Sequence, residues 1–190
     1  QAKLLEIECK DDLSFSVEEI IKCIETQDLR LLCIANPNSP TGTIIQPAEL
    51  EQIVSVANKR STIVLIDEAY YLFYPESISH LVNKYPNLVV TRTFSKALGL
   101  ASARLGFVVG SKEMVAALHK VRPMYEVNAL GALFVEKLLQ HPEIIDRNIA
   151  LTLEGKTYLE SELDKLGLRY FKSQANFLLI DVGSFEKSAE

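Results

Sequence analysis

The sequence predicts an α/β protein: a mostly parallel sheet with flanking helices, followed by part of a smaller α+β C-terminal domain. The first observation is that short apolar runs at 29–35, 63–66 and 88–94 alternate with amphipathic helical patterns. This alternation is typical of a parallel sheet whose strands are joined by helices. The second observation is the length of 190 residues, which is enough for one large domain and a piece of another.

Two helices are predicted from their start signals. Ser16 and Glu19 fit a capping box ahead of an apolar helical stripe. A second helix begins near Pro47, because proline is suited to the first turn of a helix, and it is expected to turn Ile53 inward. Between the two helices, segment 36–42 contains two prolines and a glycine, which predicts a turn.

The strand after 88–94 is expected to break the parallel pattern. Only ten residues, Ser95 to Arg104, separate it from the next apolar run at 105–109. A parallel crossover needs about a dozen residues or more. We therefore expect run 105–109 to lie antiparallel to the preceding strand, or to occupy a separate position in the sheet.

After Gly110 the pattern is mainly helical and ends in two short strands. The predicted helices are 111–121, 128–140 and 142–166, and the predicted strands are 169–171 and 177–182. Because a helix as long as 142–166 often links domains, we place a boundary near residue 150. Residues 1–150 are then part of the large domain, and 151–190 form the linking helix and the start of the small one. The chain begins with Gln1, so we interpret it as part of a longer protein.

Composition argues against several classes of partner. The net charge is −5 and no basic face is apparent, so nucleic acid is not an expected partner. No apolar run approaches the roughly 20 residues that cross a bilayer, so no membrane role is expected. The three histidines lack the spacing of metal ligands, and no metal is expected. The odd number of cysteines indicates reduced thiols and a cytoplasmic location, with Cys33 expected in the core.

The segment 91–110 carries the clearest chemical signal. It places Lys96 and Arg104 eight residues apart and sets the hydroxyls of Thr93 and Ser95 beside them. A lysine drawn into a fold favours its neutral, nucleophilic form and can make an imine with a carbonyl cofactor. The hydroxyls and the guanidinium could hold a phosphate on that cofactor. Alternatively, Lys96 is a solvated loop residue and Arg104 anchors a nearby carboxylate.

Asp67 and Tyr70 follow the apolar run 63–66. A carboxylate at a strand end can pair with a protonated ring nitrogen, and Tyr70 can donate its phenol to a nearby oxyanion. Strand-end carboxylates are also metal ligands or helix caps, and that reading stays open. Glu68 should point to the opposite side of the extended chain, which argues against a pair of cooperating carboxylates.

Together, the turn at 36–42, Asp67–Tyr70 and segment 91–100 with Arg104 resemble the signatures of fold-type I pyridoxal-phosphate enzymes. Within these, the sequence is most similar to class I/II aminotransferases of the histidinol-phosphate aminotransferase type. The resemblance spans essentially the whole chain, including 122–128 and 173–177.

The resemblance implies pyridoxal 5'-phosphate as cofactor and assigns roles to individual residues. Lys96 would bind the cofactor covalently and later move a proton between substrate and cofactor. Asp67 would pair with the pyridine nitrogen and Tyr70 with the 3-hydroxyl. The phosphate would be held by Thr93, Ser95 and Arg104.

One position departs from the family pattern. The family commonly has asparagine immediately before Pro-Thr-Gly, where its amide reaches a cofactor oxygen. This chain has Ser39 there and Asn38 one position earlier. Both remain candidate cofactor-binding residues, and the serine contact is expected to be lost or made through water.

The function implied is transfer of an amino group between an amino acid or amine and a 2-oxo acid. L-Histidinol phosphate with 2-oxoglutarate is the pair that the resemblance favours. Two alternatives stay open: a pyridoxal-phosphate-dependent decarboxylase of the threonine-phosphate type, and a non-catalytic, aminotransferase-like sensing domain. Members of the family are homodimers, so a homodimer is expected for the full-length protein. The resemblance also places further active-site residues outside this chain, which is therefore expected to be an incomplete catalytic unit.

Overall fold

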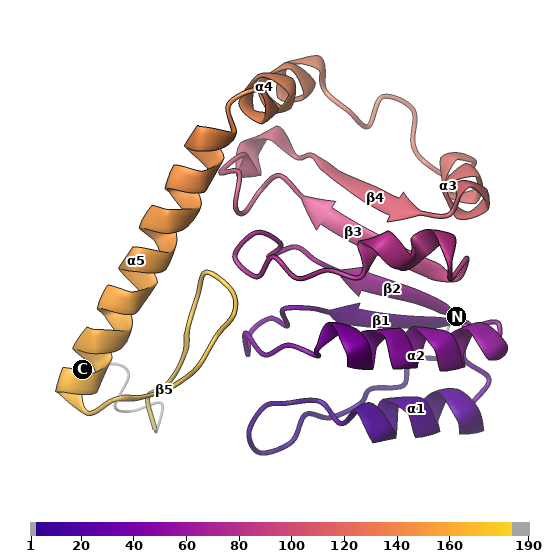
Figure 1. The fold of residues 1–190 in the computed structure, drawn as a ribbon, viewed down its shortest axis with the longest axis horizontal. Helices are drawn as coiled ribbons and strands as arrows, with labels where there is room; N and C mark the ends of the chain where they lie inside the picture. The colour runs from indigo at the N-terminus through magenta and orange to yellow at the C-terminus, as the bar shows by residue number, and fades with distance from the viewer. Residues whose placement is uncertain (1–2, 184–190) are drawn as a thin grey trace.

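Three parallel strands and one antiparallel strand form the central sheet. The computed structural model describes residues 3–183 and orders the strands β1-β2-β3-β4 (Figure 1). The strand bounds are β1 Leu31–Ala35, β2 Ile63–Asp67, β3 Leu88–Thr93 and β4 Gly106–Gly110. β1, β2 and β3 pair in parallel, whereas β4 is antiparallel to β3. The sheet confirms the α/β prediction and the reversal expected from the short connection before β4.

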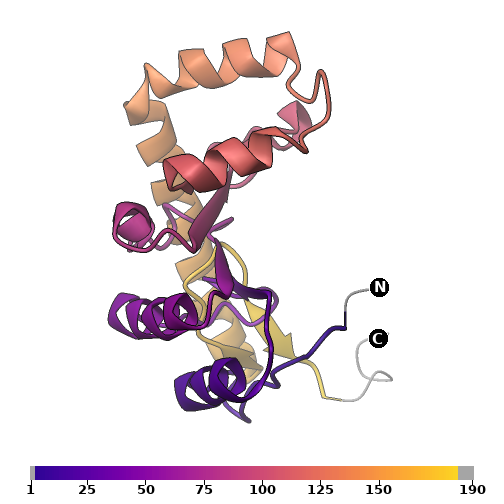
Figure 2. The same ribbon diagram turned by 90° about the vertical axis from the view of Figure 1, so that its right-hand side faces the viewer.

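Two helices pack against one face of the sheet. Helix α1 (Val17–Thr26) begins after Ser16, whose side chain accepts a hydrogen bond from the backbone N–H of Glu19. Helix α2 spans Pro47–Lys59 with proline in its first turn, as predicted. The helices lie side by side along the sheet (Figures 1 and 2). Their apolar sides join one core cluster with the sheet, including Ile20, Ile24, Leu50, Ile53, Val64, Ile66, Leu88 and Val90.

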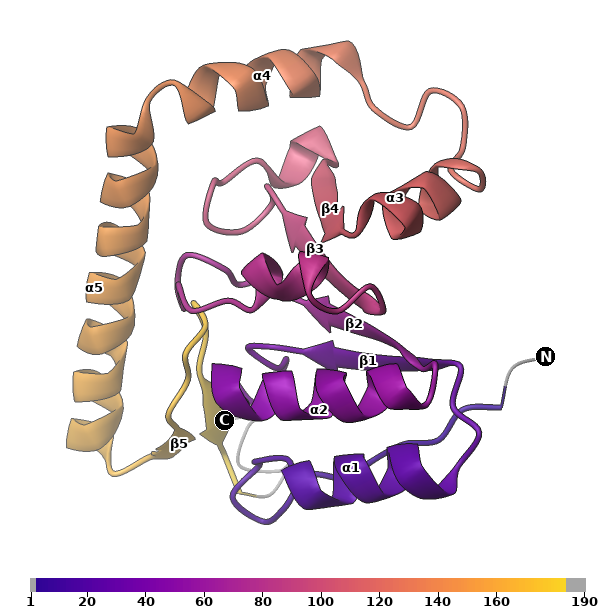
Figure 3. The same ribbon diagram turned by 45° about the vertical axis from the view of Figure 1, so that its right-hand side comes forward.

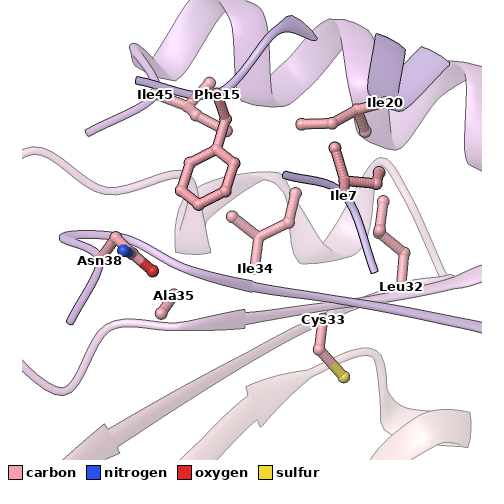
Figure 4. A pocket seen from close by; sticks show the side chains of 9 residues that line it. All are labelled: Ile7, Phe15, Ile20, Leu32, Cys33, Ile34, Ala35, Asn38 and Ile45. Atoms are coloured by element: carbon pink, nitrogen blue, oxygen red, sulfur yellow. The ribbon is translucent and has the colours of Figure 1, made fainter. Parts of the chain in front are cut away.

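The prediction that Cys33 belongs to the core is wrong. Side chains alternate along a strand, so Leu32 and Ile34 turn towards the helices and Cys33 turns to the other face. Figure 4 shows Ile34 beside Phe15, with the Cys33 sulfur pointing away from this group. Cys33 is consequently exposed, and the apolar run alone could not reveal that only one of its two faces is covered.

Beyond β4 the chain forms three helices and a two-stranded antiparallel ribbon, as predicted. Their bounds are α3 Lys112–His119, α4 Ala129–Leu139, α5 Pro142–Leu166, β5 Arg169–Phe171 and β6 Leu179–Asp181. Two short 3-10 helices, η1 (Ser79–Asn83) and η2 (Ala101–Ala103), were not predicted. No helix in the described part of the chain is long and apolar enough to cross a membrane.

Helix α5 runs past the end of the sheet where β1, β2 and β3 terminate (Figures 1 and 3). It continues without a break through residue 150, so no change in secondary structure marks the expected domain boundary. Ile145 of α5 joins a second apolar cluster with Phe73, Ala97 and Leu98. This cluster fixes the segment after β3, which carries Lys96, against the start of α5.

Candidate functional site

The carboxylate of Asp67 lies at the carboxyl end of β2, next to β3. Asp67 pairs in register with Thr91 across the parallel strands. Its Oδ1 accepts hydrogen bonds from the backbone N–H of Ala69 (3.1 Å) and from the Thr91 hydroxyl (3.3 Å). Within residues 3–183, Oδ2 has no hydrogen-bond partner. The carboxylate is therefore held in place by one oxygen, and the other can accept a hydrogen bond from a ligand.

Lys96 lies beside Tyr70, in the loop that follows β3. Its Nζ is 5.3 Å from the centroid of the Tyr70 ring. It also lines an open hollow of about 350 Å³, together with Gly99 and, from α5, Thr152. The side chain of Lys96 is exposed within residues 3–183. The reason is that its neighbours Ala97 and Leu98 are the residues that enter the core.

The three expected phosphate ligands form two local groups. The Thr93 hydroxyl accepts a hydrogen bond from the Ser95 backbone N–H (3.0 Å) and donates to the Leu105 carbonyl (3.3 Å). Arg104 follows η2 in the left-handed backbone region and is exposed, and its Nη1 donates to the Ala101 carbonyl (3.1 Å). Thr93 and Ser95 are thus brought together, while Arg104 is bonded within its own turn.

Asn38 and Ser39 do not line the hollow beside Lys96. The Asn38 side-chain amide donates to the Thr41 hydroxyl (2.9 Å), within the same turn. Asn38 instead lines a small apolar cavity of about 100 Å³ over β1, with Phe15 and Ile34 (Figure 4). Ser39 is exposed. The turn at 36–42 is nevertheless connected to the site, because it contacts the segment between β5 and β6, which in turn contacts Tyr70.

This ribbon brings residues to the site to which the sequence alone assigned no role. The ring of Phe177 meets that of Tyr70 edge to face, with centroids 5.0 Å apart. The backbone N–H of Gln174 donates to the Gly42 carbonyl (2.8 Å) in the turn. The connection between β5 and β6 therefore packs against Tyr70, which itself belongs to the loop after β2.

Lys156 of α5 anchors the same connection. Its Nζ donates to the carbonyls of Ser173 (2.7 Å) and Ala175 (2.9 Å). Burial lowers the pKa of Lys156, and the charge of Glu160 partly opposes this change. A signal for this role exists in the sequence, because Lys156 falls at helical spacing on the inward stripe of Ile149 and Leu163.

Replacing Gly42 with alanine is expected to destabilise the full-length protein and loosen this connection. Gly42 has φ of +71°, and a Cβ there would overlap the side chain and Cα of Ser173. A non-glycine residue in this region costs roughly 1–3 kcal/mol, and the overlap adds to that cost. Gly167→Ala is the matched control, because Gly167 has φ of +67° but open space around it. Equal losses of unfolding free energy in denaturant titrations of the two variants would contradict the role of the Ser173 contact.

Comparison with known proteins gives a consistent result over the whole chain. The family model for aminotransferase class I and II matches residues 1–190. The histidinol-phosphate aminotransferase of Thermoanaerobacter sp. (strain X514) is 35% identical over 175 residues, covering 92% of this chain and 49% of that protein. The chain spans about half the length of the curated relatives it matches.

Solved structures share the fold. The histidinol-phosphate aminotransferase of Sinorhizobium meliloti, solved in complex with pyridoxal-5'-phosphate, matches with a TM-score of 0.84 and 25% identity. That match covers 96% of this chain and 50% of the other. L-Threonine-O-3-phosphate decarboxylase from Porphyromonas gingivalis matches with a TM-score of 0.70 and 23% identity, over 83% of this chain and 49% of that one. The second likeness concerns the fold alone.

Proposed function

Because this chain belongs to the family of class I and II aminotransferases, we propose that the full-length protein moves an amino group between an amino acid or amine and a 2-oxo acid. L-Histidinol phosphate and 2-oxoglutarate are the proposed substrates, on the strength of the named function of its relatives. One observation carries the proposal: Asp67 ends β2, Tyr70 follows it, and Lys96 follows the adjacent strand β3, with Lys96 Nζ 5.3 Å from the centroid of the Tyr70 ring.

The residues present fit pyridoxal 5'-phosphate as cofactor. When bound, this group supplies a protonated ring that withdraws electrons from the reacting carbon of the substrate. Asp67 would accept the N–H of that ring through Oδ2, while Oδ1 stays bonded to Ala69 and Thr91. The Tyr70 hydroxyl would donate to the cofactor's 3-oxygen. Lys96 Nζ would bind the cofactor covalently, and after displacement by the amino substrate it would move the proton as a general base and acid.

The phosphate of the cofactor would be bound by the hydroxyl of Ser95 and the exposed guanidinium of Arg104. A guanidinium is suited to this task, because its N–H groups match two phosphate oxygens at once. Thr93 would complete this group by orienting the Ser95 backbone, and its own hydroxyl could turn to the phosphate only by leaving the Leu105 carbonyl. Asn38 and Ser39 are not assigned to the phosphate: a contact from their turn to another cofactor oxygen would be lost or made through water.

The test is an absorption spectrum of the full-length protein with pyridoxal phosphate. Wild type is expected to show a visible band that Lys96→Ala lacks, because a covalent imine bond to this lysine shifts the cofactor's absorption. Lys84→Ala is the control, since Lys84 is an exposed lysine paired with Glu51 on another part of the surface. A spectrum that is identical in wild type and Lys96→Ala would contradict the proposal.

Product analysis then separates the candidate reactions. Incubation with histidinol phosphate and 2-oxoglutarate is expected to yield glutamate. Release of carbon dioxide from threonine phosphate would indicate a decarboxylase instead. A lysine-dependent band without turnover of either substrate would indicate a sensing domain.

The proposal includes the assembly and location of the protein. A homodimer would cover exposed apolar side chains that gather in the stretch 121–134, namely Val121, Met124, Tyr125, Leu130 and Phe134. Exposed apolar side chains that form a common surface are typical of interaction sites. The three unpaired cysteines support a cytoplasmic location. Residues 1–150 and 151–190 would belong to the large and the small domain of each subunit.

Phe134→Lys is expected to shift the full-length protein from dimer to monomer, because it places a charge among the apolar side chains that the dimer would bury. Glu136→Lys is the matched control, since Glu136 is an exposed neighbour on the same helix, α4, at a position turned away from Phe134. Sedimentation velocity measures the outcome. A monomeric wild type, or equal behaviour of the two variants, would contradict the proposed interface.

A further inference from the structure

Glu68 and Arg92 form a buried ion pair behind the candidate site. Only 3% of the Glu68 side chain and 14% of the Arg92 side chain are exposed. Arg92 donates to Glu68 Oε2 from Nε at 2.8 Å, and its Nη2 is also 2.8 Å from that oxygen. The pair lies on the helix-covered face of the sheet, because side chains at 68 and 92 continue the inward alternation of Ile66 and Val90.

The ion pair binds the loop that follows β2. Ser77 Oγ lies 2.6 and 2.9 Å from the two Glu68 carboxylate oxygens and donates to them. Arg92 Nη2 donates to the hydroxyls of Ser77 (2.8 Å) and Ser79 (3.2 Å). The Arg92 guanidinium carbon lies 3.4 Å from the centroid of the Tyr71 ring. The buried charges are thus paired and hydrogen-bonded, as the high cost of an uncompensated buried charge requires.

This loop connects the ion pair to the residues that face the site. Tyr70 stands at its beginning, where its ring lies near Lys96 Nζ. Phe73, further along, packs in the cluster with Ala97 and Leu98, the buried neighbours of Lys96. If the loop left the ion pair, both the Tyr70 ring and the packing beneath the lysine would lose their support.

We propose that Glu68 and Arg92 are positioning residues for the reaction: they clamp the loop at 69–79 from behind the sheet and so set the placement of Tyr70 relative to Lys96. The inference rests on the proposed function, because the aligned groups are those assigned to the cofactor. Glu68 adjoins Asp67 in sequence, and Arg92 lies between Thr91 and Thr93. One pair would therefore adjust both strand ends, and neither of its members is assigned to the cofactor.

The test compares Arg92→Met, Glu68→Gln and the milder Arg92→Lys in the full-length protein. Lys84→Met is the matched control, because it breaks an exposed ion pair with Glu51 (2.6 Å) outside this network. Without cofactor, hydrogen exchange of the amides at 69–79 is expected to be faster in Arg92→Met and Glu68→Gln than in the control. Arg92→Lys keeps the charge but cannot place two nitrogens on Glu68 Oε2 or stack on the Tyr71 ring, so an intermediate exchange rate is expected.

With cofactor, Arg92→Met and Glu68→Gln are expected to lower kcat on the order of 10²-fold, because a displacement of about 1 Å in a group at an active site has such an effect. KM is expected to change little. The pH midpoint of the cofactor's absorption change should also move. If the ion pair served stability alone, the variants would have a lower unfolding temperature, but the kcat of the folded protein and this pH midpoint would equal those of Lys84→Met. That result would overturn the proposal. If wild type showed no lysine-dependent band, the proposed function would fail, and the hydrogen-exchange comparison would still decide whether the clamp holds the loop.

Discussion

Asp67→Asn is expected to lower the amino-transfer rate of the full-length protein by on the order of 10²–10³-fold, the effect of removing one group that stabilises charge in a transition state. The structure gives the reason. The Asp67 carboxylate is fixed through Oδ1 by the Ala69 N–H and the Thr91 hydroxyl. An asparagine keeps nearly the same shape but carries no charge, so it cannot balance a protonated ring nitrogen.

The measurement is the initial rate of glutamate formation by protein saturated with pyridoxal phosphate. Asp28→Asn is the matched control, because it removes the charge of an exposed aspartate that precedes β1. The lysine-dependent absorption band should persist in Asp67→Asn, which would show that the cofactor is bound and that the loss concerns the reaction. A rate equal to that of Asp28→Asn would rule out the assigned role.

Ile53→Ala is expected to destabilise the protein by about 2–5 kcal/mol, the usual cost of truncating a large buried aliphatic side chain. Ile53 lies at the centre of α2, is fully buried (0% exposed) and belongs to the core cluster that includes Val64 and Leu88. The loss combines the transfer free energy of the removed carbons with the cavity that remains, because a strand and a helix can close around it only partly.

Denaturant titration of the full-length protein measures this change in unfolding free energy. Gln52→Ala is the matched control, because it truncates the neighbouring residue on the exposed side of the same helix. Its effect is expected to stay within about 0.5 kcal/mol, as for most surface substitutions. Similar losses in the two variants would mean that α2 does not pack on the sheet as described.

The secondary structure was predictable wherever a local signal decides the conformation. Proline at the start and Gly167 after the end define α5, and the predicted range is the observed one. The antiparallel direction of β4 was one of the two arrangements predicted from the length of the preceding connection, because that segment is too short for a parallel crossover. The exposure of Cys33 was not predictable, since it depends on which face of the sheet is covered by other parts of the chain.

The candidate site was predictable only in part, for a similar reason. That Tyr70 and Lys96 lie close together follows from their positions after adjacent strands. The clamp of Glu68 and Arg92 depends on strand register and on the path of an irregular loop, neither of which leaves a local pattern. The Lys156 contacts join α5 to carbonyl groups of the chain's last described ribbon, and carbonyl positions cannot be read from residue types.

The reversal between β3 and β4 makes Lys96 a hairpin-loop residue. Register pairing of Thr93 with Gly106 closes the base of this hairpin. A Cβ at Gly106 would meet the Arg92 carbonyl, so the two strands cannot easily change their spacing there. Insertions or deletions in the loop would thus change how far the amine reaches while the strands keep their places.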